Sequence, residues 1–266
     1  MSNLRPLEKY TLLFLVFIGV FACQNITLQT PIDRSSSSDT VDNPIRNAAI
    51  MYLIADQIAL TPDECTKTYI TTNLVWPLPA NYGRISSETR NFQTIIGIDS
   101  TIDIASQYPN FLNPETTFSV AVGGNTACDA ITQFNSIKTP NPQNFVISSA
   151  DGNGLLHGIR ADDSVKTTIR LVSKIRSRWP NVKVAVVGVH PTRLQGINSV
   201  KDYTNSQIAT YLKSLTHTCY YDPMPLFGVG PGESAPASLM LDSIHYNGNI
   251  SFQIKEKLRE NCEISI

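Results

Sequence analysis

Short apolar runs recur along the chain from residue 94 onward, and longer amphipathic stretches separate them. Four runs have the length of buried strands, and a weaker fifth follows: Thr94–Ile98, Phe118–Val122, Phe145–Ile147, Val182–Val189 and Cys219–Tyr221. Between and after them, apolar residues recur at helical spacing, most clearly in Asp163–Trp179, Asn205–Leu215 and Ile250–Leu258. Strands that alternate with helices predict a parallel sheet covered on both faces, a doubly wound three-layer α/β/α fold.

The N-terminal segment follows a different pattern. Arg5 and Lys9 precede the apolar run Tyr10–Ala22, and Cys23 follows it. A positive head, an apolar run too short to span a bilayer and a small residue before the cysteine predict a secretory signal. Val20–Cys23 is similar to a bacterial lipobox, in which the cysteine is acylated. We therefore expect an exported protein that is lipid-anchored in the bacterial cell envelope, either periplasmic or surface-exposed; an ordinary cleaved signal peptide is the alternative.

Four parts follow from these patterns. Residues 1–22 are expected to form a lipoprotein signal peptide, and residues 23–43, with the run Ser35–Ser38, a flexible tether. Residues 44–90 read as a helical and irregular extension, and residues 91–266 as the main domain.

Composition narrows the class of partner. The 266 residues are 42% hydrophobic and 16% charged, which is enough to bury a substantial core. Basic and acidic residues number 21 and 22, so the formal net charge is −1. Because no basic field is available to hold phosphate backbones, we expect no nucleic-acid partner.

Polar segments follow the predicted strands and precede the last helix. They are Gly97–Thr101, Gly123–Thr126, Asp151–Gly154 and Asp242–Asn247. In an open parallel sheet the ligand site lies beyond the carboxyl ends of the strands, so these segments converge on one edge. Together they supply a hydroxyl, a glycine for close approach, a side-chain amide and an Asp/His pair. Acyl transfer to a serine needs that set of groups.

The order Ser, Gly, Asn, Asp-x-x-His resembles that of the SGNH (GDSL-like) hydrolases over roughly Thr94–Leu258. Ser100, with Asp99 before it, matches the last two residues of the family's Gly-Asp-Ser segment. Gly124 matches the glycine that donates its backbone N–H. Asn153 matches the asparagine of the family's Gly-x-Asn-Asp segment. Asp242 and His245 match the Asp-x-x-His segment in full.

This resemblance implies a flavodoxin-like, five-stranded parallel sheet and a serine ester hydrolase. Ser100 would be the nucleophile, His245 its base and Asp242 the carboxylate that orients His245. The backbone N–H groups of Ser100 and Gly124 and the amide of Asn153 would form the oxyanion hole. No cofactor or metal is needed. Expected substrates are small acyl or acetyl esters of carbohydrate, peptidoglycan or lipid.

Three residues depart from the family pattern. Ile98 stands where the family has the glycine before Asp99, and Asp151 and Gly154 replace the outer residues of Gly-x-Asn-Asp. These departures motivate an alternative function, a catalytically impaired surface lipoprotein that acts as an interaction protein. A nucleotide-binding α/β domain is a third possibility, but no glycine-rich phosphate fingerprint is present.

Other residues compete for the same roles. Asp-Ser at a strand end is also a common helix N-cap. Asn125 rivals Asn153, although only Asn153 leaves room for two parallel crossovers after Ser100. His157 and His190 follow strands at the same edge and are candidates for substrate contact or for a structural role. His217 precedes the fifth strand and should face the opposite edge.

The cysteines predict a disulfide framework. Of five cysteines, setting Cys23 aside leaves four, an even number that suits an exported protein and permits three pairings. The fifth strand begins at Cys219, and the last helix should end near it at Cys262. We therefore predict Cys219–Cys262, which leaves Cys65–Cys128. No cysteine or histidine cluster has zinc-ligand spacing, so no metal site is expected.

Overall fold

The computed structural model describes residue 85 and residues 87–266. The expected secretory signal, Cys23, the tether, Cys65 and the helix-like segment of the extension lie outside the described residues. Within the described part, no helix combines the length and the apolar character needed to cross a membrane.

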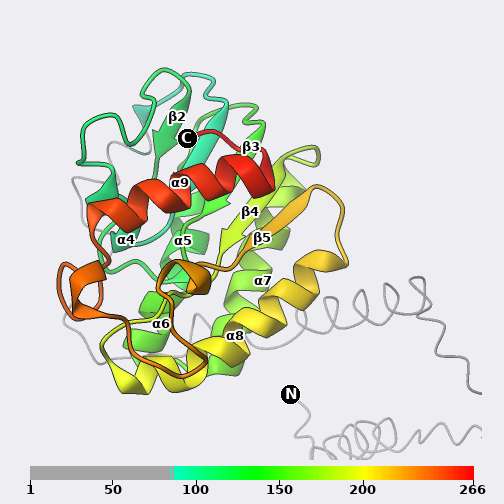
Figure 1. Ribbon diagram of the computed structural model, residues 1–266. Helices are drawn as coiled ribbons and strands as arrows, with labels where there is room; N and C mark the ends of the chain where they lie inside the picture. Colours follow the sequence, from blue (N-terminus) through cyan, green and yellow to red (C-terminus); the bar gives the residue numbers. More distant parts are fainter. Residues whose placement is uncertain (1–84, 86) are drawn as a thin grey trace, which may run out of the picture. The chain divides into compact units, whose positions relative to one another are not determined.

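Five parallel strands form one sheet in the order β2-β1-β3-β4-β5 (Figure 1). Their bounds are β1 Thr94–Gly97, β2 Thr117–Ser119, β3 Asn144–Ile147, β4 Lys183–Val187 and β5 Thr218–Tyr221. The strand order is that of flavodoxin-like sheets, in which the chain changes direction of winding at β1 and β3. The predicted five-stranded parallel sheet is therefore confirmed.

Successive residues of each strand point to opposite faces, and helices bury both faces. Ile95 belongs to a core that includes residues of α5 Ala127–Phe134, α7 Ala161–Arg178 and α8 Gln195–Lys213. Ile96 belongs to a second core, with residues of α4 Ser100–Ala105 and α9 Gly248–Cys262. Short helices complete the order: α6 Gly152–Leu156, η2 Met224–Leu226 and η3 Ala237–Leu239. The three layers of the predicted α/β/α fold are present.

Helix α8 begins ten residues earlier than the predicted helix Asn205–Leu215, which is a correction. Its first half turns polar residues inward: Asn198, Lys201 and Thr204 are fully buried. Asn198 Oδ1 accepts from the Thr192 N–H, and its Nδ2 donates to the Thr192 carbonyl. Because the buried stripe is polar there, apolar periodicity does not reveal it.

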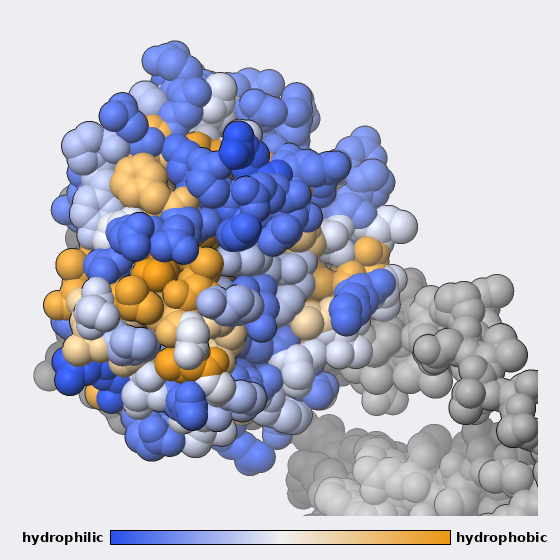
Figure 2. Space-filling view, in the orientation of Figure 1, coloured by the Kyte–Doolittle hydropathy of each residue, from blue (hydrophilic) through white to orange (hydrophobic). Residues whose placement is uncertain are grey.

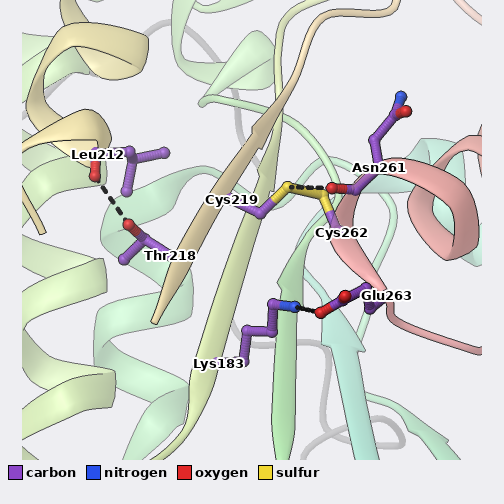
Figure 3. Close-up of a disulfide and its surroundings, with 7 residues drawn as sticks. All are labelled: Lys183, Leu212, Thr218, Cys219, Asn261, Cys262 and Glu263. Carbon is purple, nitrogen blue, oxygen red and sulfur yellow. Dashed lines mark hydrogen bonds and ion pairs between the residues drawn. A yellow bond between two sulfur atoms is a disulfide. The ribbon is translucent and has the colours of Figure 1, made fainter. Parts of the chain in front are cut away.

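A disulfide joins Cys219 at the start of β5 to Cys262 at the end of α9, the pairing predicted from the sequence (Figure 3). Their Cα atoms are 5.6 Å apart. One residue beyond Cys262, Glu263 forms an ion pair with Lys183 of β4 at 2.8 Å. Both contacts fasten the end of α9 to the edge of the sheet where the strands begin. Cys128 is also disulfide-bonded, and its predicted partner Cys65 lies outside the described residues, so that pairing stays a prediction.

Candidate active site

Ser100 is the first residue of α4, directly beyond the carboxyl end of β1. Asp99 is the N-cap: its Oδ1 accepts from the Thr101 N–H at 3.1 Å and from the Ser148 hydroxyl at 3.1 Å. Asp99 is therefore buried and turned into the protein. The N-cap role that the Asp-Ser pair suggested falls to Asp99, and the half-buried hydroxyl of Ser100 takes no part in the cap.

A chain of hydrogen bonds runs from Ser100 to the loop before α9. His245 Nε2 lies 2.8 Å from Ser100 Oγ, and His245 Nδ1 lies 2.7 Å from Asp242 Oδ2. The other carboxylate oxygen of Asp242 accepts from the backbone N–H groups of Ile244 and His245, at 2.6 and 2.7 Å. The structure thus brings together three residues that span 145 positions of the sequence.

Asp242 stays ionised over the ordinary pH range. Partial burial acts to raise the pKa of its carboxyl, but hydrogen bonds from the His245 ring and from the backbone N–H groups of His245 and Ile244 outweigh burial. They lower the pKa of Asp242 to about 2. A permanent negative charge at Nδ1 favours the histidine tautomer that carries its proton on Nδ1 and presents a lone pair on Nε2 to the hydroxyl.

His190 holds the loop that carries Asp242 and His245. It follows β4 and is buried, and its Nε2 donates to the Ile244 carbonyl at 2.7 Å. Its ring packs against Phe227 and Tyr246, which also contact each other. Burial lowers the pKa of His190, which favours the neutral ring. Of the four histidines considered, the structure places His245 and not His190 against Ser100. A second tie, from the Arg193 N–H to the Ser243 carbonyl at 2.9 Å, docks the same loop.

The other two histidines lie elsewhere. His157 is the C-cap of α6, and His217 precedes β5 with a positive φ of 56°. The His217 carbonyl accepts from the Val184 N–H at the edge where the strands begin, opposite the candidate site.

The loop after β2 contacts α4, and Asn153 after β3 lines the same small cavity as Ser100. Gly124 has φ 80°, a left-handed conformation suited to glycine. The N–H of the preceding Gly123 donates to Asp103 Oδ2 of α4 at 3.0 Å. Among the described residues, none accepts from the Gly124 N–H. On the β3 side, Asn153 Nδ2 donates to the Asn125 carbonyl at 2.8 Å. One N–H of the Asn153 amide therefore ties the two loops together, and the amide has a second N–H to offer.

Asn125, the rival of Asn153, does not face the site. It is buried, and its amide pairs with the Gln133 side chain near the end of α5. Its backbone carbonyl contributes instead, as the acceptor for Asn153.

The space beside Ser100 is small. A cavity of about 10 Å³, room for about one water molecule, is lined by Ser100, Asn153 and His190 among others. A larger cavity, of about 430 Å³, lies between α8 and the segment after β5, and none of the catalytic candidates lines it. In the described part of the chain, no three or more His, Cys, Asp or Glu side chains are grouped in a way that could hold a metal ion.

Sequence reasoning missed several residues that position these groups. Asp103, Ser148 and Thr101 contact the candidate residues or their supports, yet each is an ordinary polar residue of a helix or a strand end. Only the distances that folding creates reveal these contacts. The Val189-His190-Pro191 segment did carry a signal, because a histidine at the carboxyl end of a strand was already a candidate for this edge.

Comparisons with known proteins agree with this architecture. No family model matches the chain, and no curated protein matches it. Solved structures do. A Streptococcus pneumonia protein proposed as a platelet activating factor superposes with a TM-score of 0.60 at 8% identity, covering 80% of this chain and 98% of that one. A Bacteroides fragilis protein proposed as an acylhydrolase superposes with a TM-score of 0.57 at 16% identity, covering 70% of this chain and 95% of that one. A GDSL-like lipase from Bacteroides thetaiotaomicron superposes with a TM-score of 0.52 at 16% identity, covering 80% of this chain and 96% of that one.

These likenesses define the class of fold. The chain has the three-layer α/β/α fold of GDSL-like ester hydrolases. At 8% to 16% identity they show the fold alone, so the activity has to be argued from the residues of this chain.

Proposed function

We propose that this protein is a serine ester hydrolase with Ser100 as nucleophile, His245 as base and Asp242 as the orienting carboxylate. One observation carries the proposal: the unbroken hydrogen-bonded chain Ser100 Oγ, His245 Nε2, His245 Nδ1, Asp242 Oδ2, with contacts of 2.8 and 2.7 Å. These are the distances at which a base takes the proton of a nucleophile.

The reaction would proceed in two halves. Ser100 Oγ attacks the ester carbonyl carbon while its proton moves to His245 Nε2, and the carbonyl oxygen becomes an oxyanion. The Ser100 and Gly124 N–H groups and the remaining amide N–H of Asn153 stabilise that oxygen. His245 then protonates the departing alcohol, which leaves an acyl-Ser100. A water molecule, deprotonated by His245, attacks the acyl carbon; the bond to Ser100 Oγ breaks, His245 returns the proton to Oγ, and the acid is released.

Small acyl or acetyl esters are the substrates that this site suits best. The restricted space beside Ser100 supports a short acyl group. Apolar surface gathers below α9, over the segment between β5 and α9 (Figure 2). In this segment Leu241, next to Asp242, is 53% exposed. Such a surface would contact the alcohol portion of a saccharide, peptidoglycan or lipid ester.

The test is a pair of measurements on the wild type and Ser100→Ala. We expect the wild type to hydrolyse 4-nitrophenyl acetate and to be labelled at Ser100 by a fluorophosphonate. Ser100→Ala should lose both properties and keep the wild-type melting temperature, because the change removes one half-buried hydroxyl at the start of α4 that takes no part in the helix cap. A folded wild-type protein that neither hydrolyses esters nor takes the label would refute the proposal. That result would favour the catalytically impaired interaction protein.

We also propose that the protein is exported and lipid-anchored through Cys23. The support is the sequence alone: a short apolar run that ends at Ala22-Cys23 after two basic residues. Mass spectrometry of the mature N-terminus decides the matter. An acylated Cys23 is expected, and an unmodified terminus on a soluble form would contradict the proposal.

A further inference from the structure

Asp151 is a buried carboxyl group beside the proposed oxyanion hole. It lies between β3 and α6, its exposed fraction is 1%, and its backbone is left-handed, with φ 61° and ψ 39°. Few residues other than glycine adopt that conformation without strain. In the Gly-x-Asn-Asp segment of the family that this sequence resembles, a glycine occupies this position.

The carboxylate connects three elements. Asp151 Oδ1 accepts from the Ala127 N–H, the first residue of α5, at 2.8 Å. Its Oδ2 accepts from the Thr167 hydroxyl of α7 at 3.2 Å. Burial raises the pKa of Asp151 to about 7, although these two hydrogen bonds act to lower it. Burying this carboxyl group costs free energy, and the hydrogen bonds from Ala127 and Thr167 offset part of that cost.

The side chain of Asp151 occupies the space that belongs to residue 154. A Cβ atom built on Gly154 would lie 2.3 Å from Asp151 Oδ2 and 2.5 Å from its Cγ, closer than a Cβ atom approaches its non-bonded neighbours. A side chain at position 154 and the present Asp151 side chain therefore exclude each other. In Asp151-Gly152-Asn153-Gly154 the carboxylate stands at the first position, whereas the family segment Gly-x-Asn-Asp has it at the fourth.

We propose that Asp151 is a positioning residue for the oxyanion hole and that Asp151 and Gly154 are a compensating exchange. The inference rests on the proposed function. Two contacts, Ala127 N–H to Asp151 and Asn153 Nδ2 to the Asn125 carbonyl, run in opposite directions between the same two loops. Together they fix the segment that carries Gly124 relative to Asn153, and so hold the two proposed donors in one relative placement.

The consequence is catalytic because donor placement matters at sub-ångström scale. A displacement of about 1 Å can lower a rate by about 100-fold. Without the Asp151 carboxylate, the Ala127 N–H loses its acceptor, and the start of α5 loses one of its two ties to the loop that carries Asn153. The departures from the family pattern that suggested an impaired protein become a second arrangement of the same parts.

The test uses the full chain and four variants: Asp151→Gly, Gly154→Asp, the double variant and Asp151→Asn. Asp151→Gly should lower kcat for 4-nitrophenyl acetate by about 10- to 100-fold with a smaller change in KM, because donors are misplaced and substrate contacts remain. Asp151→Asn keeps an acceptor for Ala127 N–H and should retain most of kcat. Gly154→Asp alone puts two side chains in one space and should lower the melting temperature.

The double variant is the decisive comparison. Restoring a carboxylate from position 154 while vacating position 151 should recover kcat and the melting temperature above both single variants, a strong positive coupling. Val172→Ala, at a fully buried position of α7, is the control for stability: it should lower the melting temperature and leave kcat unchanged.

The outcomes separate the two proposals. A wild type without activity or Ser100 labelling overturns the proposed function and this inference with it. An active wild type whose kcat is unaffected in Asp151→Gly overturns the positioning role alone. If the changes in melting temperature and in log kcat of the double variant equal the sums of the changes in the two single variants, the proposed compensating exchange is wrong.

Discussion

Asp99 and Ser100 are neighbours in sequence and point in different directions. Asp99 turns inward and caps α4, and Ser100 turns toward His245. In an Asp-Ser pair after a strand, either the aspartate or the serine can cap the helix that follows. Which residue takes which role is decided by Ser148, 49 positions away, whose hydroxyl fixes the Asp99 carboxylate. That partner is invisible in the local sequence.

Removing the side-chain donor tests the oxyanion hole at the scale of one amide. Asn153→Ala should lower kcat by about 100- to 1,000-fold, the usual effect of losing one such donor. Steady-state kinetics with an acetyl ester measure it. Asn141→Ala makes the same chemical change on the exposed segment before β3 and should have no effect. Equal activity of Asn153→Ala and wild type would remove Asn153 from the hole.

The raised pKa of Asp151 predicts how stability changes with pH. The folded protein holds the Asp151 proton up to a pH of about 7, whereas the unfolded chain releases it near the ordinary value of 3.8. The folded state binds more protons in this interval, so Asp151 lowers the free energy of unfolding as pH rises from about 4 to about 7. The slope from one such group is at most about 1.4 kcal/mol per pH unit.

Asp151→Asn removes that titration. Denaturant unfolding of wild type and variant between pH 4.5 and 8 gives the contribution of Asp151 as a difference. We expect the stability of the wild type to decline more steeply with rising pH than that of the variant. Parallel curves would mean that the pKa of Asp151 is not raised.

At the scale of single elements, apolar periodicity predicts strands better than it predicts helices. Four strands lie within two residues of the expected bounds at each end, because a buried parallel strand is apolar on both faces. The edge strand β2 ends at Ser119, short of the predicted Val122, although Val120 N–H and Val122 N–H still donate to β1 and the residue after it. The first half of α8 was missed because Lys201 and its polar neighbours face inward.

The segment from η3 to α9 depends on His190 for its position. His190→Phe keeps an aromatic ring against Phe227 and Tyr246 but leaves the part-buried Ile244 carbonyl without its donor, a loss of about 0.5–1.5 kcal/mol. We expect kcat and the rate of fluorophosphonate labelling to fall together by about 10-fold or more, because His245 is no longer held against Ser100.

His190→Gln supplies the control for that loop. Its amide can donate to the same carbonyl, so part of kcat and of the labelling rate should return. A Phe variant with a lower melting temperature and an unchanged labelling rate would show that His190 only stabilises the fold.

For the whole molecule, the sequence predicts the topology and the edge at which the site lies, because polar segments after strands must meet there. It does not predict the contacts that align the groups. The exchange between Asp151 and Gly154, the tie from Asn153 to Asn125 and the support of His245 by His190 each join residues through space. A single sequence carries no record of such pairs.

The disulfide is expected to stabilise the molecule without affecting catalysis. Cys219–Cys262 closes a loop of 43 residues at the edge of the sheet away from Ser100. Replacing both cysteines with serine should lower the free energy of unfolding by about 2–4 kcal/mol and leave kcat unchanged. Denaturant titration and ester kinetics on the same samples check both parts. A large drop in kcat would show that anchoring the end of α9 also positions the loop that carries His245.

The distance in sequence between Ser100 and its base has a consequence for the order of synthesis. His245 is made 145 residues after Ser100, and the loop that carries it is held by His190 and Arg193 and leads into α9, which packs on the sheet. While the chain is still emerging from the ribosome, its serine is an ordinary hydroxyl with no base beside it. Under the proposed mechanism, the chain cannot attack an ester until the loop that carries His245 has docked beside Ser100.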